Sequence, residues 1–399
     1  MINTNAHLQS SHLQKIQLHK NQLQTRINSI DAMRGLVMII MLLDHVRERV
    51  FMHHQVSDPM DLDTTSPALF FSRIAAHLCA PVFVFLTGLS AWLYQHKANG
   101  DSHPVRQFLI SRGLLLIALE ITLVTFSWMG SYHTIWLQVI WAIGVSMIVL
   151  GLIAHWPRIV LAIIGLLIVC GHNLLTPITF TPNEWGYTLW TILHDRNFLI
   201  AEGAIRIKAS YPVLPWIGVI ILGYLAGPLY AAATSSATRR LYLLGLGCVC
   251  LISFVLLRST NINGETLPWQ FMQSSLLTAM SFLNLTKYPP SLDFLLLTLG
   301  TMFLLLILLE SKISDRASKV LSHYGSAPMF FYLLHLYILL IMYWILESIY
   351  GRNHGDYFGV EHMGWVWLIA VLLAVVLYWP TKRFAQFKRA TSLRWVKYF

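Results

Sequence analysis

The chain has 399 residues, of which 56% are hydrophobic and only 12% are charged. Soluble domains carry roughly 25% charged residues, so this composition excludes an ordinary water-facing globular protein. The formal net charge is +10 at pH 7, but the basic residues lie between apolar runs, as in loops of membrane proteins, and we therefore expect no nucleic-acid binding.

The chain divides into a polar start, a long apolar region and a short basic end. Residues 1–26 are rich in Gln, His and Asn and lack the apolar core of a signal peptide. We expect a disordered cytosolic tail over 1–26, a transmembrane domain over 27–390 and a second cytosolic tail over 391–399.

Long apolar runs recur through the middle region. A helix needs about 20 mostly apolar residues to cross a bilayer. The predicted fold class is therefore all-α, a polytopic membrane helix bundle of about ten transmembrane helices. The predicted spans are 33–52, 67–95, 106–128, 134–154, 157–175, 212–233, 239–258, 291–311, 326–349 and 365–381.

The charge distribution predicts an orientation. Placing both termini in the cytosol puts most of the 28 Lys and Arg residues on or next to that side, so we expect an N-in, C-in topology. Segment 176–211 is then a long outer connection, and the apolar stretch 266–286 is an interfacial or re-entrant segment.

The first predicted span contains ionisable residues that are costly inside a bilayer and therefore suggest a functional site. At 100° per residue, Arg34 and His45 fall within about 20° of one helical face and about 16 Å apart along the axis. One face of this helix thus carries a cation near the cytosolic surface and an imidazole deep in the membrane. This arrangement suits a long anionic ligand. The alternatives are that Arg34 is a snorkelling anchor and that Asp44 and His45 form a satisfied pair between helices.

Further polar residues occur in the later spans. Arg73 and His77 are four residues apart and share a helical face in the second span. Two histidines on neighbouring helices can mark a cavity, or they can join helices through hydrogen bonds.

The third span begins with Arg106 and Arg112 and carries Glu120 deeper. Guanidinium groups are well suited to chelating phosphate, although arginines at this position can also be ordinary positive-inside residues. Lys287 precedes the eighth span, and His335 lies within the ninth. The four cysteines lie in apolar stretches without the spacing of a disulfide framework or a zinc site, and we expect no metal.

Seven sequence motifs, in the same order along residues 26–390, resemble the heparan-α-glucosaminide N-acetyltransferase catalytic-domain family, a branch of the transmembrane acyltransferases. The motifs after the first are similar to those of bacterial members of that branch. The motifs start at Arg26-x-x-Ser-Ile-Asp-Ala-Met-Arg34-Gly-Leu, Asp44-His-Val-Arg-Glu48, His77-Leu-Cys-Ala-Pro81, Trp141-Ala-Ile-Gly144, Tyr211-Pro-Val-Leu-Pro-Trp216 and Lys287-Tyr-Pro-Pro-Ser291, and Pro328-Met-Phe-Phe-Tyr-Leu-Leu-His335 completes the series.

The resemblance implies an enzyme that moves an acyl group, usually acetyl, from cytosolic acyl-CoA to an acceptor at the opposite membrane face. The broader superfamily carries an Arg-x10-His motif on its first helix, which Arg34 and His45 match. In the human lysosomal branch the catalytic histidine lies further along, where this chain has His53 and His54. We favour His45 as the catalytic residue because it shares a face with Arg34 and has Asp44 beside it.

On this hypothesis the CoA phosphates rest on Arg34, Arg106 and Arg112. His45 acts as a general base, or is itself acylated, and either Asp44 or Glu120 orients its ring. The candidates for lining the acceptor side or cavity are His77, Glu120, Lys287, His335 and His54.

Other functional classes remain open from the sequence. A proton-coupled secondary transporter or a lipid or glycan flippase would also use buried ionisable groups, and a non-catalytic scaffold would need them only for folding. The expected partners are the lipid bilayer, acetyl-CoA as co-substrate and a small-molecule or glycan acceptor. The expected location is a bacterial cytoplasmic (inner) membrane. The sequence does not distinguish a sugar amine from a glycan hydroxyl as the acceptor.

Overall fold

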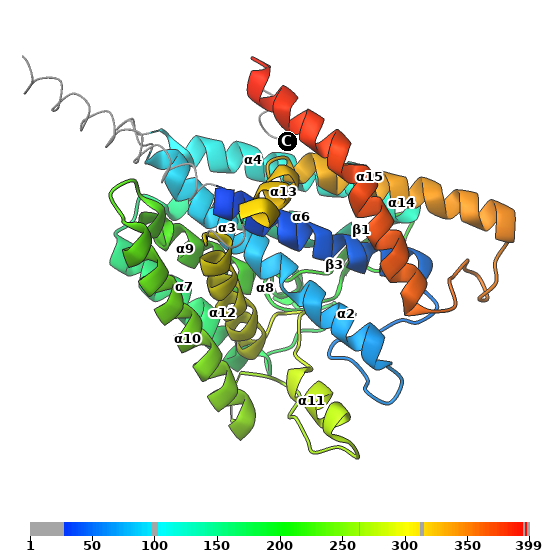
Figure 1. Cartoon of the computed structure of the whole chain (residues 1–399). Coiled ribbons are helices and arrows are strands. Elements are labelled where there is room, and N and C mark those ends of the chain that lie inside the picture. Colours follow the sequence, from blue (N-terminus) through cyan, green and yellow to red (C-terminus); the bar gives the residue numbers. More distant parts are fainter. Residues whose placement is uncertain (1–27, 97–102, 263, 312–314, 394–395, 397–399) are drawn as a thin grey trace, which may run out of the picture.

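Helices make up most of the protein in the computed structural model, which describes residues 28–96, 103–262, 264–311, 315–393 and 396 (Figure 1). The first helix covers residues 28–50. The elements that follow are α2 (Pro67–His77), α3 (Cys79–Gln95), α4 (Val105–Leu119), η1 (Glu120–Val124), α5 (Thr125–Met129), β1 (Thr134–Leu137), α6 (Val139–Ile153), α7 (Arg158–Gly171), η2 (His172–Leu175), α8 (Tyr187–Leu193), β2 (Phe198–Ile200), β3 (Arg206–Ala209), α9 (Leu214–Leu225), η3 (Gly227–Tyr230), α10 (Ser236–Thr260), α11 (Ser275–Leu283), α12 (Leu292–Leu309), α13 (Asp315–Gly325), α14 (Pro328–Tyr350) and α15 (Met363–Ala390).

The all-α membrane bundle predicted from the sequence is confirmed. Among the residues described, seven helices are long and apolar enough to cross a membrane. They are Pro67–Gln95, Val105–Met129, Arg158–Leu175, Ser236–Thr260, Leu292–Leu309, Pro328–Tyr350 and Met363–Ala390. The protein is therefore a multi-pass membrane protein. The count of about ten spans and the N-in, C-in orientation are not confirmed by the structure and stay predictions.

Three of the predicted spans differ from the seven for physical reasons. The helix over residues 28–50 is long, but it contains Asp31, Arg34, Asp44 and the charged residues that follow. Helices α6 and α9 are apolar but have only 15 and 12 residues, fewer than the roughly 20 that a bilayer requires. Residues 134–137, predicted as the start of a helix, form strand β1 instead.

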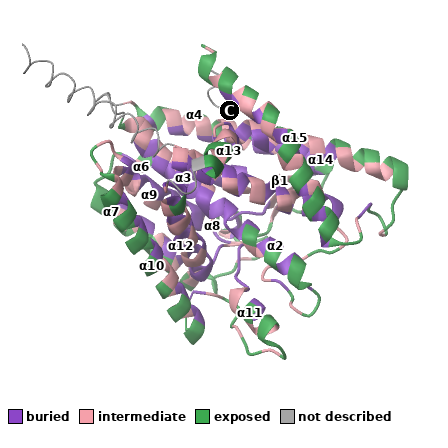
Figure 2. Ribbon diagram, in the orientation of Figure 1, coloured by how far each residue is buried: buried purple, intermediate pink, exposed green. Residues whose placement is uncertain are grey.

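The span over α2 and α3 lies at the centre of the bundle. Of its most apolar window, 78% is buried inside the protein, compared with 17% for α10. In Figure 2 the buried residues gather on α3, α6 and α12, whereas the visible faces of α7, α10 and α15 are largely exposed. Exposed apolar faces on the outer helices are where a membrane protein contacts lipid tails.

Helices α3 and α9 approach closely because glycines face each other's backbone. A Cβ atom at Gly88 would overlap the carbonyl oxygen of Ile220, and one at Gly223 would overlap that of Phe85. Small residues at such crossings allow two helix backbones to come into contact.

The helix over Val105–Met129 contains a π-helical turn, η1, at Glu120–Val124. The backbone N–H of Thr125 reaches the carbonyl oxygen of Glu120, five residues earlier, and its hydroxyl donates to the same oxygen at 2.8 Å. Single π-helical turns inside α-helices occur frequently at functional sites.

The long connection between α7 and α9 is ordered by a small sheet. Its strand order is β1-β3-β2, with β1 parallel to β3 and β2 antiparallel to it. Segment 266–286, predicted as interfacial or re-entrant, contains only the nine-residue helix α11, which is too short to cross a bilayer.

The ends of the chain are only partly described. The predicted tail over 1–26 lies outside the described residues, as does most of the tail over 391–399. Helix α15 continues to Ala390, nine residues past the end of the predicted span at 381. Helix α15 packs against α13 through Tyr378, whose hydroxyl group lies 3.0 Å from Nδ1 of His323, and its last turns extend beyond α13 (Figure 1).

Candidate active site

A cavity of about 350 Å³ opens between the helix over residues 28–50 and helices α3, α4, α6 and α14. Asp31, Arg34 and Met41 line it from the first helix, so it follows that helix for ten residues, or about 15 Å. Its walls on α4 and α6 are mostly apolar, including Leu116 and Ile143. Apolar walls with a few convergent polar groups are typical of a ligand pocket.

One part of this cavity is basic. Arg34, Arg112 and Lys388 are the cations among its described lining residues. Arg34 donates to the Asp31 carboxylate at 2.9 Å and to the Ser90 hydroxyl on α3, so its guanidinium group is held in place. Three cations against one carboxylate give this region a net positive charge, which suits phosphate groups.

The other part of the cavity approaches His45. Met41 lies one helical turn before His45, and Tyr332 lines the same cavity from α14. The ring centres of Tyr332 and His45 are 5.9 Å apart. The imidazole does not itself line the cavity, but it is in contact with a side chain that does.

His45 and His335 form a direct pair between the first helix and α14. Nδ1 of His45 lies 2.7 Å from Nε2 of His335, and Nδ1 of His335 lies 2.8 Å from the carbonyl oxygen of Phe331. His335 is fully buried, and the edge of Trp128 packs against His45 with ring centres 5.0 Å apart. The sequence suggested His335 as a cavity-lining residue, whereas in the structure it is the hydrogen-bond partner of His45.

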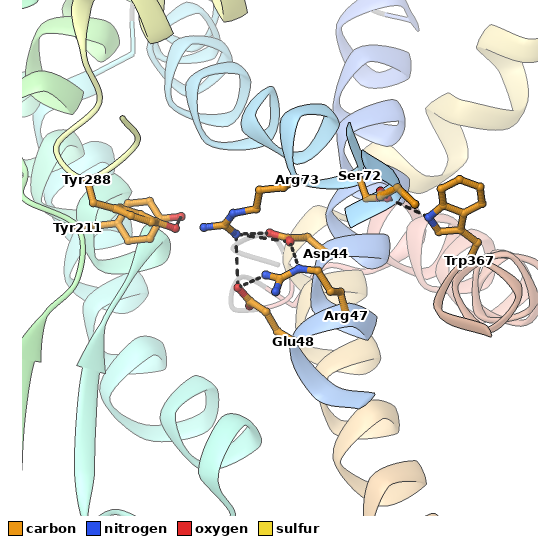
Figure 3. Close-up of polar contacts among 9 residues, drawn as sticks. Asp44, Arg47, Glu48, Ser72, Arg73, Tyr211, Tyr288 and Trp367 are labelled. Atoms are coloured by element: carbon orange, nitrogen blue, oxygen red, sulfur yellow. Dashed lines mark hydrogen bonds and ion pairs between the residues drawn. The ribbon is translucent and has the colours of Figure 1, made fainter. Parts of the chain in front are cut away.

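The carboxylate of Asp44 contacts two arginines, Arg47 and Arg73 (Figure 3). Its Oδ1 accepts from Nε of Arg47 at 3.0 Å, and its Oδ2 accepts from Nη1 of Arg73 on α2 at 3.2 Å. Glu48 adds a second carboxylate, 2.9 Å from Nη2 of Arg47. The two carboxylates and two arginines balance in charge, as a buried ionic cluster requires.

The Asp44 cluster faces two tyrosines and a buried lysine. In Figure 3, Arg73 extends toward Tyr211 and Tyr288, whose hydroxyl groups are 3.1 Å apart. Lys287 precedes Tyr288, is 4% exposed and interacts electrostatically with His45 and with His77 on α2. The structure therefore brings Lys287 and His77 to the same region as His45.

The loop that carries Lys287 is tied to the loop between the first helix and α2. The Asp58 carboxylate accepts from the backbone N–H of Lys287 at 3.1 Å and from that of Tyr288 at 2.8 Å. Burial raises the pKa of Asp58 above its usual 3.8, while Arg73, Lys287 and these two hydrogen bonds oppose the shift. Helix α12 begins directly after this loop because Ser291 accepts from the N–H of Phe294.

Three predicted site residues lie apart from this arrangement. Arg106 is exposed and does not line the cavity. His54 is exposed beyond the end of the first helix, where neighbouring His53 stacks on His354 at 3.7 Å. Glu120 is buried in the π-helical turn and accepts from the backbone N–H of Trp141 at 2.9 Å, so it does not orient His45.

Several residues of the site were not singled out from the sequence. Lys388 and Ser90 belong to the basic part of the cavity, and Trp128 and Tyr332 surround His45. The basic residues near the end of α15 include Lys388 and could have indicated an anion site there, but they were used only to predict the orientation of the chain in the membrane. Among the residues described, no group of three His, Cys, Asp or Glu side chains is placed to hold a metal ion.

Comparison with known proteins identifies the family. The sequence model for the family described as "Heparan-alpha-glucosaminide N-acetyltransferase, catalytic" matches residues 26–251. No curated protein matches the chain significantly. The match covers more than half of the 399 residues, including the first helix, α3, α4 and α6, which line the cavity. The chain therefore belongs to the heparan-α-glucosaminide N-acetyltransferase catalytic family of membrane acetyltransferases that use acetyl-CoA.

Proposed function

We propose that this protein transfers an acetyl group from cytosolic acetyl-CoA to a hydroxyl or amine, on a sugar or glycan, at the opposite face of a bacterial cytoplasmic membrane. The observation that carries the proposal is the cavity lined by Arg34 at its basic part and by Tyr332 next to His45. Family membership favours this function over a proton-coupled transporter or a flippase.

The cavity supports a specific placement of acetyl-CoA. Its 350 Å³ lies at the low end of the range for small-molecule pockets, roughly 300–1,000 Å³. This volume suits the acetylated pantetheine arm, with the nucleotide phosphates at Arg34, Arg112 and Lys388. The thioester then lies toward Met41 and Tyr332. Arg106 is exposed outside the cavity, so in this arrangement it does not contact the phosphates of acetyl-CoA.

His45 is the proposed general base. It takes the proton of the acceptor hydroxyl or amine as the acceptor attacks the thioester carbonyl carbon. A C–O or C–N bond forms, the C–S bond breaks, and the proton passes from His45 to the departing CoA thiolate. A route through acetyl-His45 uses the same atoms in two steps.

The acceptor is proposed to approach from the side of Lys287 and His77. Lys287 has no hydrogen-bond partner for its ammonium group among the described residues, and it interacts electrostatically with His45. Asp44 is the nearest carboxylate in sequence, and its charge acts on the imidazolium formed during transfer, although its direct partners are arginines.

The test compares His45→Ala with His54→Ala, which separates the two candidate positions for the catalytic histidine. Purified full-length protein is supplied with radiolabelled acetyl-CoA and a panel of amino sugars and glycans. Loss of a general base lowers the rate by roughly 10²- to 10⁴-fold. We expect this loss in His45→Ala and near-normal transfer in His54→Ala, because His54 is exposed and away from the cavity.

Acetyl-CoA binding, measured by calorimetry on the same preparations, should persist in both variants. Undiminished transfer by His45→Ala would reject His45 as the base. Absence of acetyl-CoA binding in the wild-type protein would reject the placement of the co-substrate.

A further inference from the structure

The hydrogen bonds around His335 determine which of its nitrogens carries hydrogen. Its Nδ1 lies 2.8 Å from the carbonyl oxygen of Phe331, and a carbonyl oxygen can only accept, so Nδ1 is the donor. His335 is fully buried, and no carboxylate contacts it among the described residues, so a charged ring there would be unpaired. In the neutral ring Nε2 is therefore an acceptor.

The same reasoning then applies to His45. Its Nδ1 lies 2.7 Å from the accepting Nε2 of His335, so Nδ1 of His45 carries a hydrogen and donates it. Neutral imidazole has only one N–H, which leaves a free lone pair on Nε2 of His45. Among the described residues, the imidazole of His45 makes its hydrogen bond through Nδ1, to His335.

The ring geometry supports a directed hydrogen bond. The two imidazole planes are 16° apart and their centres are separated by 5.0 Å. Face-to-face stacking would keep all ring atoms at van der Waals separation, about 3.5 Å or more, whereas the two nitrogens are 2.7 Å apart. The rings therefore lie edge to edge and nearly in one plane, which aligns the N–H with the lone pair.

We propose that His335 is a positioning residue that fixes the tautomer of His45, so that Nε2 of His45 is the atom that takes the proton from the acceptor. This inference rests on the proposed role of His45 as the base. The arrangement performs the task that a carboxylate performs in the Ser-His-Asp triad. Here a neutral ring takes that place because the nearest carboxylate, Asp44, is bound to Arg47 and Arg73.

The first test needs no turnover. The full-length protein is purified with ¹⁵N-labelled histidine, and the His45 signals are assigned by comparison with His45→Gln. We expect a protonated Nδ1 and an unprotonated Nε2 for His45 in the wild-type protein. His335→Leu replaces the imidazole with an apolar side chain of similar size that cannot accept a hydrogen bond. In this variant we expect a mixture of the two tautomers of His45. A wild-type signal with the proton on Nε2 would overturn the proposal.

The second test uses rescue by a conservative variant. The side-chain oxygen of glutamine can accept a hydrogen bond near the position of Nε2, so His335→Gln should restore the tautomer that His335→Leu loses. Loss of the correct tautomer in the Ser-His-Asp triad costs roughly 10⁴-fold in kcat. We expect a fall of about 10²- to 10⁴-fold in kcat for His335→Leu, a substantially smaller fall for His335→Gln, and an unchanged KM for acetyl-CoA.

The outcomes separate this inference from the proposed function. If His335→Leu keeps both the tautomer and the wild-type kcat, the positioning role is refuted. If the tautomer is as expected but His45→Ala retains full transfer, the proposed base is wrong and the hydrogen-bond assignment stands. A melting temperature for each variant shows whether a loss of kcat reflects unfolding, and the wild-type spectrum decides the tautomer even if both His335 variants fail to fold.

Discussion

The carboxylate of Asp44 on the first helix lies 3.2 Å from the guanidinium of Arg73 on α2, and both side chains are buried. The same carboxylate binds Arg47. This shared contact joins the helix that carries His45 to the helix that carries His77. It also explains why Asp44, although adjacent to His45 in sequence, is not the group that holds the imidazole.

Replacing Asp44 is therefore expected to reduce stability. Asp44→Ala leaves the buried Arg47 and Arg73 with Glu48 as their remaining carboxylate, and breaking a buried ion pair costs about 3–5 kcal/mol. We expect a marked fall in the thermal unfolding temperature of the purified protein, with Asp356→Ala, an exposed position, as the unaffected control. A loss of kcat without any change in unfolding temperature would instead show that Asp44 acts mainly on the chemistry.

The basic part of the cavity predicts a difference between two arginines on α4. Arg112 lines the cavity, whereas Arg106 is exposed outside it. A hydrogen bond to a charged group contributes about 1.5–3 kcal/mol, so Arg112→Gln should weaken acetyl-CoA binding by about 10- to 100-fold. Arg106→Gln should bind within about twofold of wild type. Calorimetric titration with acetyl-CoA measures both, and equal weakening by the two variants would contradict the placement of the phosphates.

The crossing of α3 and α9 predicts a site where one methyl group is harmful. A Cβ at Gly88 would overlap the backbone of Ile220, whereas one at Gly245 on α10 would meet nothing within 4 Å. Overpacking costs about 1–3 kcal/mol, while alanine in an open helical position stabilises by up to about 1 kcal/mol. Gly88→Ala should lower the unfolding temperature and Gly245→Ala should not. Equal stability of the two variants would mean that α3 and α9 do not pack as described.

His53, which stacks on His354 beyond the end of the first helix, predicts a response of the fold to acid. Burial, then His354 and His54, lower the pKa of His53 below 6.5, and Glu361 opposes them. A depressed pKa means that the folded state favours the neutral ring. The contribution of neutral His53 to the free energy of unfolding is fully present above pH 6.5. It is lost as the pH falls from 6.5 through the lower pKa that His53 has in the folded state.

Acidification should therefore loosen the segment that follows α14. His53 stacks on His354 at 3.7 Å, and the N–H of Val360 donates to the carbonyl oxygen of Val50 at 2.8 Å. Hydrogen exchange of residues 351–360 should accelerate between about pH 7.5 and about pH 5 beyond its intrinsic pH dependence. His53→Phe, which keeps the stacked ring but cannot be protonated, should reduce this response. An identical response in the variant would exclude His53 as its source.

The helical periodicity of the first helix was enough to predict one important relationship. Arg34 and His45 are expected to share a face because a spacing of eleven residues brings them within about 20° of each other, and Met41 lies about 20° to the other side of Arg34. The cavity does follow that face as far as Met41. Arg34 lines the cavity from this face, and the role of the face in acetyl-CoA binding stays a prediction.

The partners of these residues were not predictable in the same way. His335 is 290 residues from His45, and Ser90 is 56 residues from Arg34, so no local pattern relates them. Adjacent residues on a helix point about 100° apart, which is why Asp44 reaches α2 while His45 reaches α14. The number of spans was also uncertain, because α6 and α9 are apolar but short.

The π-helical turn at Glu120–Val124 sets how the two halves of its helix are aligned. One extra residue in that turn moves every later side chain back by one position, or about 100° around the axis. Trp128 therefore points where residue 127 of an uninterrupted helix would point, within about 20° of Leu116 on the cavity wall. Deleting one residue inside the turn would leave the indole beside His45, whereas the same deletion between Leu116 and the turn would rotate it away. Removing one residue from the turn would thus shorten this helix and still keep Trp128 in register with Leu116.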